Sequence, residues 1–174
     1  MRGWNYRYLG PAELRALVRP CGEGQPIRSL ADFKDWVSAR SQEELAEPFT
    51  FVIDMDGVLR LAPRRSEHVV CAGGGQVLSA GEMSFDRPAG RWAAIEVSNQ
   101  STGYRPDGDS WPSVADALAR AELEHPGGFT HEVVFRRCLH CKEHNIVRED
   151  DFVCVFCGGD LPPEWNVDPL GAAS

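Results

Sequence analysis

The chain has 174 residues, of which 43% are hydrophobic and 9% aromatic, values that suit one ordinary domain together with a second, small one. Its formal net charge is −8, so we do not expect general electrostatic attraction to phosphate backbones or anionic lipid. The chain has no apolar run of the length that a membrane span or a signal peptide requires, so we expect a cytoplasmic protein. Its 16 arginines and 2 lysines are typical of a GC-rich bacterial genome.

Residues 1–47 have the patterns of short helices. Pro11 stands where a first helical turn would begin, and the apolar residues after it share one helical face until Pro20 ends the run. Ser29 and Ser41 each stand three positions before an acidic residue, which is the spacing of a capping box. We therefore predict an N-terminal helical region.

From residue 48 the pattern changes to that of strands. Residues 49–53 and 58–61 flank an Asp-Gly turn signal at 56–57, which predicts a β-hairpin. Apolar residues at helical spacing predict one helix over 113–123. The other strands expected in this part are 68–71, 76–78, 82–85, 91–98 and 131–135.

The most specific signal is a pair of Cys-x-x-Cys sequences separated by twelve residues. Four thiolates from two tight turns form the ligand set of a structural, tetrahedral Zn²⁺ site. Gly158 and Gly159 follow the second pair and permit the sharp turn that a metal knuckle needs. The four cysteines are Cys138, Cys141, Cys154 and Cys157.

This cysteine spacing resembles that of a zinc ribbon over residues 136–164. The resemblance implies a small fold organised around a structural zinc ion. We expect Cys21 and Cys71 to be ordinary thiols, since disulfides are rare in the cytoplasm.

A polar, turn-rich segment at residues 97–106 carries hydroxyl, amide, phenol and guanidinium groups. Together with His68 and the Ser-Ala-Gly-Glu sequence at 79–82, it resembles a β-rich module found near the C-termini of bacterial secreted toxin-like proteins, over residues 49–125. That module has an Asn-x-Ser-Gly-His-Tyr-x-Pro loop, whereas Thr and Gly at 102–103 replace its Ser-Gly-His step here. The alternative is a connecting loop whose Asn and Ser side chains bond local backbone.

Loops with many unlike polar groups often hold sites, so this segment is a candidate pocket for a nucleotide-like small molecule. His68, Tyr104 and Glu132 resemble the His-Tyr-Glu set of ADP-ribosyltransferases. The resemblance implies that His and Tyr hold the nicotinamide ribose and ring while Glu stabilises an oxocarbenium-like transition state. The candidate pocket residues are His68, Glu82, Asn99, Ser101, Tyr104, Arg105 and Glu132.

Residues 51–59 read Phe-Val-Ile-Asp-Met-Asp-Gly-Val-Leu, which resembles the nucleophile motif of haloacid dehalogenase-like phosphatases. The resemblance implies that Asp54 attacks phosphorus and Asp56 acts as acid and base, with Mg²⁺ between them. That family needs a doubly wound sheet with crossover helices, whereas strand patterns and glycine-rich turns follow the motif here. The hairpin interpretation is therefore preferred.

Together these patterns predict an α+β fold with N-terminal helices, a β-rich central domain with one helix and a C-terminal zinc ribbon. The expected boundaries are 1–47, 48–135, 136–164 and a tail at 165–174. The lack of a complete catalytic motif favours a non-catalytic, zinc-stabilised module that binds another protein in a bacterial toxin-linked or defence-linked system. The alternative is an enzyme acting on a nucleotide-like substrate. We expect neither nucleic acid nor membrane among the partners.

Overall fold

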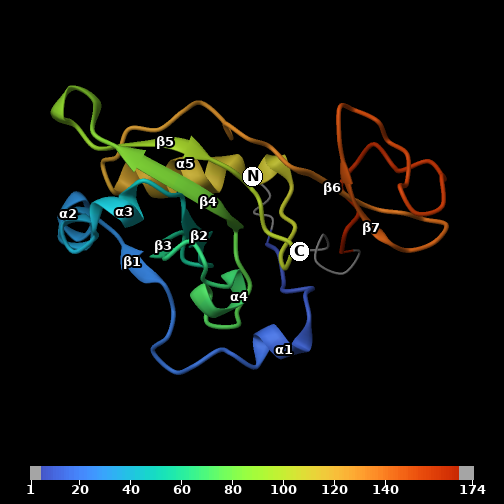
Figure 1. Cartoon of the computed structure of the whole chain (residues 1–174), viewed down its shortest axis with the longest axis horizontal. Helices are drawn as coiled ribbons and strands as arrows, with labels where there is room; N and C mark the ends of the chain where they lie inside the picture. Colours follow the sequence, from blue (N-terminus) through green and yellow to red (C-terminus); the bar gives the residue numbers. More distant parts are fainter. Residues whose placement is uncertain (1–4, 169–174) are drawn as a thin grey trace.

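A five-stranded antiparallel sheet forms the centre of the computed structural model, which describes residues 5–168 (Figure 1). The strands lie in the order β1-β3-β2-β4-β5, and each neighbouring pair is antiparallel. This arrangement confirms the predicted α+β class. The strands are β1 (Gln25–Ile27), β2 (Phe49–Ile53), β3 (Leu59–Ala62), β4 (Ser79–Asp86) and β5 (Ala93–Val97).

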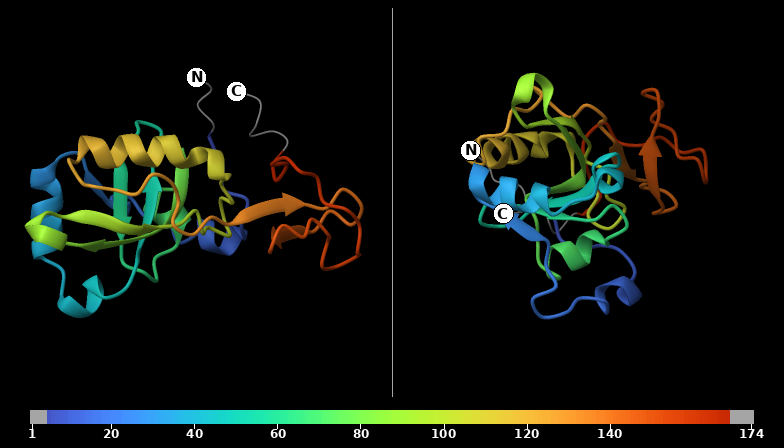
Figure 2. Two further views of the ribbon diagram at one scale, coloured as in Figure 1. Left: turned by 90° about the horizontal axis from the view of Figure 1, so that it is seen from above. Right: turned by 60° about the vertical axis from the view of Figure 1, so that its left-hand side comes forward.

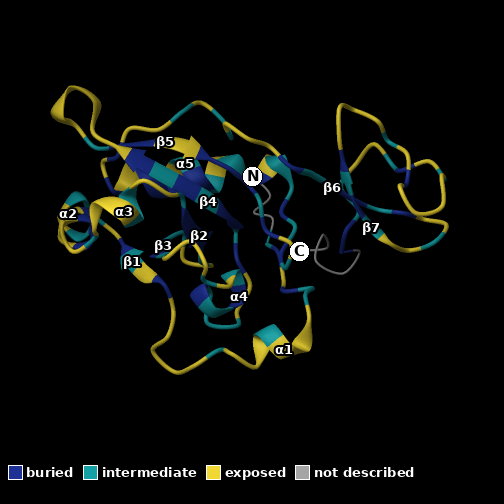
Figure 3. Ribbon diagram, in the orientation of Figure 1, coloured by how far each residue is buried: buried dark blue, intermediate teal, exposed yellow. Residues whose placement is uncertain are grey.

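Strand β2 lies in the middle of this sheet, and all five of its residues are buried. Because successive side chains of a strand point to opposite faces, complete burial requires cover on both faces. Phe51 and Ile53 join one core cluster with helices α2 (Leu30–Ser38) and α5 (Trp111–Arg120). Val52 joins a second cluster with α4 (His68–Cys71). In Figure 3 most of β4 is coloured as buried, whereas α1 (Ala12–Arg15) and α3 (Gln42–Leu45) are coloured as exposed or intermediate.

The helix starts predicted at Ser29 and Ser41 are confirmed, whereas the helix predicted over 113–123 spans 111–120. At the start of α2, the Ser29 hydroxyl accepts a hydrogen bond from the Asp32 amide at 3.1 Å. Ser41 and Glu44 form a reciprocal capping box at the start of α3 (Gln42–Leu45). The one-turn helix α1 (Ala12–Arg15) follows Pro11. Two 3₁₀ turns, η1 (Pro88–Gly90) and η2 (Gly108–Ser110), complete the helical elements of the described residues.

Two segments have a different type of secondary structure from the one predicted. Residues 25–27, within the region expected to be helical, form the edge strand β1, where Pro26 lacks the amide that a central strand would need. Residues 68–71, expected as a strand, form α4 instead. Gly73 and Gly74 adopt φ values of 64° and 83° and terminate this helix. Both elements are too short for residue periodicity to identify, so tertiary packing decides their conformation.

A second sheet forms the base of the ribbon and consists of β6 (Val134–Arg137) and β7 (His144–Val147). It lies beyond one end of the central sheet (Figures 1 and 2). Strand β6 begins three residues later than the predicted strand at 131–135, and the predicted strand at 76–78 is reduced to one bridge between Val77 and Tyr6.

The ribbon base packs against both ends of the described chain. Phe135 and Ile146 share a hydrophobic cluster with Leu9, Trp165 and Val167. The first residues of the expected tail, Trp165 and Val167, therefore pack against the ribbon base, while residues 169–174 lie outside the described part. Among residues 5–168, no helix combines the length and apolar character needed to cross a membrane.

Candidate metal centre

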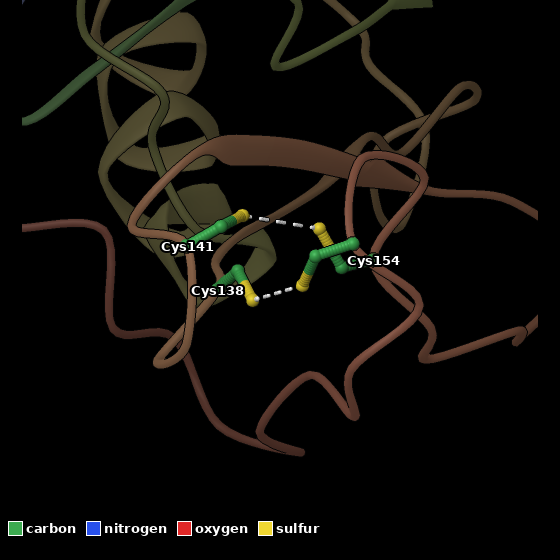
Figure 4. A group of neighbouring side chains, drawn as sticks. Cys138, Cys141 and Cys154 are labelled. Carbon is green, nitrogen blue, oxygen red and sulfur yellow. Dashed lines mark hydrogen bonds between the residues drawn. The ribbon is translucent and has the colours of Figure 1, made fainter.

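The four predicted cysteines converge in the ribbon, where all of their sulfur atoms lie within 4.8 Å of one another. The sulfurs of Cys138 and Cys157 are 3.6 Å apart, as are those of Cys141 and Cys154 (Figure 4). Four ligands at about 2.3 Å from a tetrahedral zinc ion would have sulfurs roughly 3.8 Å apart. The cluster therefore has the size and donor chemistry of a four-thiolate metal site.

The two knuckles that carry these cysteines have the same backbone geometry. In the first, the Lys142 amide donates to the Cys138 carbonyl at 3.0 Å; in the second, the Gly158 amide donates to the Cys154 carbonyl at 2.9 Å. Lys142 and Gly158 both have positive φ values, 68° and 77°. Glycine adopts this conformation freely, whereas lysine does so at a steric cost. The first knuckle therefore keeps its shape despite an unfavourable residue.

Asn145 supports the metal centre and was not identified from the sequence. Its side-chain amide donates to the Cys154 sulfur at 3.4 Å, and its carbonyl oxygen accepts from the Val155 amide at 2.9 Å. Burial raises the pKa of Cys154, but the hydrogen bonds from Asn145 and the knuckle amides outweigh it and lower that pKa. The lowered pKa favours the thiolate that binds metal. The sequence carries no signal for this role, because the burial of Asn145 and its contact with Cys154 arise only in the folded chain.

The remaining cysteines and nearby histidines are not part of this cluster within the described residues. Cys21 is exposed, whereas Cys71 is buried and its pKa is raised by burial to about 12. His140 is exposed in the first knuckle, and His144 lies half-buried in β7. The thiols at 21 and 71 thus occupy different environments from the four ligands.

Three of the candidate pocket residues have their polar groups bonded to backbone. His68 Nε2 lies 2.8 Å from the Gly81 carbonyl, and burial lowers the pKa of this histidine. The Ser101 hydroxyl accepts from the Tyr104 amide at 3.2 Å. The fully buried Tyr104 phenol donates to the Gly75 carbonyl at 2.7 Å. The Ser101 contact is local, as the loop interpretation expects, whereas His68 and Tyr104 bond backbone that is 13 and 29 residues away.

Asn99 connects the polar loop to the segment before β6. Its carbonyl oxygen accepts from the Val133 amide at 2.6 Å, and its amide donates to the carbonyls of Val133 at 2.8 Å and Pro106 at 2.9 Å. The side chain is completely buried. Asn99 therefore links two segments more than thirty residues apart.

The other three candidate residues occupy separate surroundings. Glu82 is half-buried in β4, and its backbone amide donates to the Ser98 hydroxyl at 3.2 Å. Glu132 is exposed, with its carboxylate against Gly108. Arg105 is half-buried at a positive φ of 48°. His68 and Tyr104 lie in or beside the second core cluster, which does not include Glu132.

Asp54 holds the turn of the β2–β3 hairpin. One carboxylate oxygen accepts from the amides of Asp56 at 2.9 Å and Val58 at 3.0 Å, and the other accepts from Arg60 Nε at 2.9 Å. Gly57 takes the positive φ of 79° that the turn requires. The predicted hairpin is confirmed, and its antiparallel sheet differs from the parallel sheet that a phosphatase of this type needs.

No protein-family model, curated protein or solved structure matches the chain. The evidence for a metal centre is therefore the geometry of the four cysteines themselves.

Proposed function

We propose that the four cysteines bind one structural Zn²⁺ and that the ribbon so formed is a binding module for another protein. Four thiolates complete a tetrahedral shell and leave no position for a reactive water, which is the arrangement of a structural site. Apart from Glu82, Arg105 and Glu132, the candidate pocket residues direct their polar groups to backbone, which supports a non-catalytic role.

The exposed side chains of the knuckles carry this proposal. Leu139 is 57% exposed, Val155 77% and Phe156 64%, and all three stand between the cysteines of a pair. We call these three residues the knuckle surface. Because the four sulfurs are adjacent, the two knuckles are also adjacent, so the exposed apolar residues occur in one small region. Grouped exposure of large apolar side chains typically marks a contact site for a partner.

The charge around the knuckle surface defines the partner's chemistry. Residues 138–160 contain five acidic and two basic side chains, and four thiolates on one Zn²⁺ add a charge of about −2. We therefore propose a partner with an apolar depression bordered by Lys and Arg, and we expect no affinity for nucleic acid. Cytoplasmic location and a link to a bacterial toxin or defence system stay predictions from the sequence.

The test compares the zinc-loaded chain with Phe156→Ser and with Leu17→Ser, a control at another exposed apolar residue. Each form is used to capture proteins under quantitative conditions, and captured partners are confirmed by direct titration. We expect Phe156→Ser to lose the partner and Leu17→Ser to retain it. Equal binding by both variants would contradict the proposal. So would NAD⁺ turnover that disappears in Tyr104→Phe, since that result favours the enzyme.

A further inference from the structure

The Arg105 side chain has a buried nitrogen with no hydrogen-bond partner among the described residues. Within residues 5–168 no hydrogen bond or ion pair satisfies its Nη1 atom, although that atom is buried. Burial lowers the pKa of Arg105, but an arginine stays protonated in proteins, so its charge remains. A desolvated charge is costly unless an opposite charge or a set of hydrogen bonds compensates it. Among the described residues, the buried part of the Arg105 guanidinium therefore lacks an acceptor that would offset the cost of its burial.

Other basic groups lie near Arg105 at the ribbon base. Trp165 Nε1 donates to the Arg105 carbonyl at 2.9 Å, and the Trp165 ring packs in the same cluster as Ile146 of β7. His144 lies two residues before Ile146 and so on the same face of β7. Arg137 is the cross-strand partner of His144. Arg105, Arg137 and His144 thus come from three segments to one side of the two-stranded sheet.

The electrostatics agree with this placement. His144 Nδ1 is a second buried atom without a hydrogen-bond partner among the described residues. Burial lowers the pKa of His144, and the charges of Arg105 and Arg137 lower it further, whereas Glu143 raises it. Among the described residues no carboxylate raises the pKa of Arg105; the group that does so is the phenol of Tyr8, which is neutral near pH 7 because its own pKa is raised. Positive charge thus exceeds negative charge at this position.

We propose that Arg105, Arg137 and His144 bind a phosphate group at the base of the ribbon. A dianionic phosphate matches two guanidinium charges, and its several oxygens can accept from both arginines and from the Nδ1–H of a neutral His144. A carboxylate would supply only one charge. The site is independent of the proposed function, since Asn145, on the opposite face of β7, is the residue that reaches the cysteines.

The test titrates the full zinc-loaded chain with inorganic phosphate, and separately with adenosine monophosphate, at constant ionic strength and without free zinc. Binding is followed by ³¹P NMR and by the side-chain NMR signals of the arginines and His144. We expect saturable binding that Arg105→Met weakens about tenfold or more, because it removes charge-assisted hydrogen bonds. Arg148→Met, at an exposed arginine of the same ribbon, should leave the affinity within about twofold. Equal affinities for the two ligands would show that the phosphate group alone determines binding. Tighter binding of the nucleotide would show that the site prefers a phosphomonoester.

Zinc content and circular dichroism check that Arg105→Met is folded. If it is not, Arg105→Lys retains the charge but loses the planar fork, and we expect it to weaken binding by a smaller factor. Saturable binding of neither ligand would overturn the proposal. Unchanged affinity in the folded Arg105 variant, or perturbed signals confined to residues away from the ribbon base, would also overturn it.

Discussion

Replacing Asn99 by Ala should strongly destabilise the chain, because this side chain connects the polar loop to the segment before β6. The substitution removes three buried hydrogen bonds of 2.6 to 2.9 Å and leaves the Val133 amide and two carbonyls without partners. A buried backbone group that loses its partner costs about 1–3 kcal/mol, and water entering the vacated space recovers part of this. We expect a loss of about 3–5 kcal/mol in the free energy of unfolding.

For a chain of this size such a loss lowers the melting temperature by roughly 10 °C. The assay is guanidinium unfolding followed by tryptophan fluorescence, together with hydrogen exchange at the Val133 amide, which should lose its protection. Thr102→Ala, at an exposed position of the same loop, is the control and should change the stability by less than about 0.5 kcal/mol. A change below about 1 kcal/mol in Asn99→Ala, with the Val133 amide still protected, would refute the structural role of Asn99.

Two further predictions concern a strained knuckle residue and a buried histidine. Lys142→Gly should stabilise the zinc-bound ribbon by about 0.5–1 kcal/mol, because glycine accepts the φ of 68° without a steric cost. Gly158→Ala, in the other knuckle, should destabilise the ribbon for the same reason. Competition with a chelator measures zinc retention in both variants, and equal retention would be evidence against the knuckle geometry. For His68, burial lowers the pKa in the folded chain, so the unfolded chain binds the proton more readily near pH 6 and stability should fall as the pH drops below about 6.5. His68→Gln should reduce that pH dependence, with His125→Gln as an exposed control, and identical slopes of stability against pH in all three proteins would rule this out.

The features predictable from the sequence are those encoded by neighbouring residues. The spacing of Cys138 and Cys141 reports a local turn, and the Asp-Gly turn at 56–57 and the serine before α2 are likewise local signals. The short elements β1 and α4 could not be predicted, because three or four residues take the conformation that tertiary packing selects.

The supporting residues of the site were also beyond a local pattern. Asn99 bonds to Val133, 34 residues away, so its role depends on how the loop and β6 meet. Asn145 reaches a cysteine nine residues later only because β7 lies against the second knuckle. That Nη1 of Arg105 has no hydrogen-bond partner within residues 5–168 could not be inferred without knowing which carboxylates fold elsewhere.

The most direct test of the zinc-stabilised ribbon is X-ray absorption spectroscopy at the zinc edge on the full chain purified without chelator. We predict one zinc ion per chain with four sulfur ligands at about 2.3 Å and no nitrogen or oxygen ligand. Absence of zinc, or a shell in which nitrogen or oxygen replaces a sulfur, would contradict it.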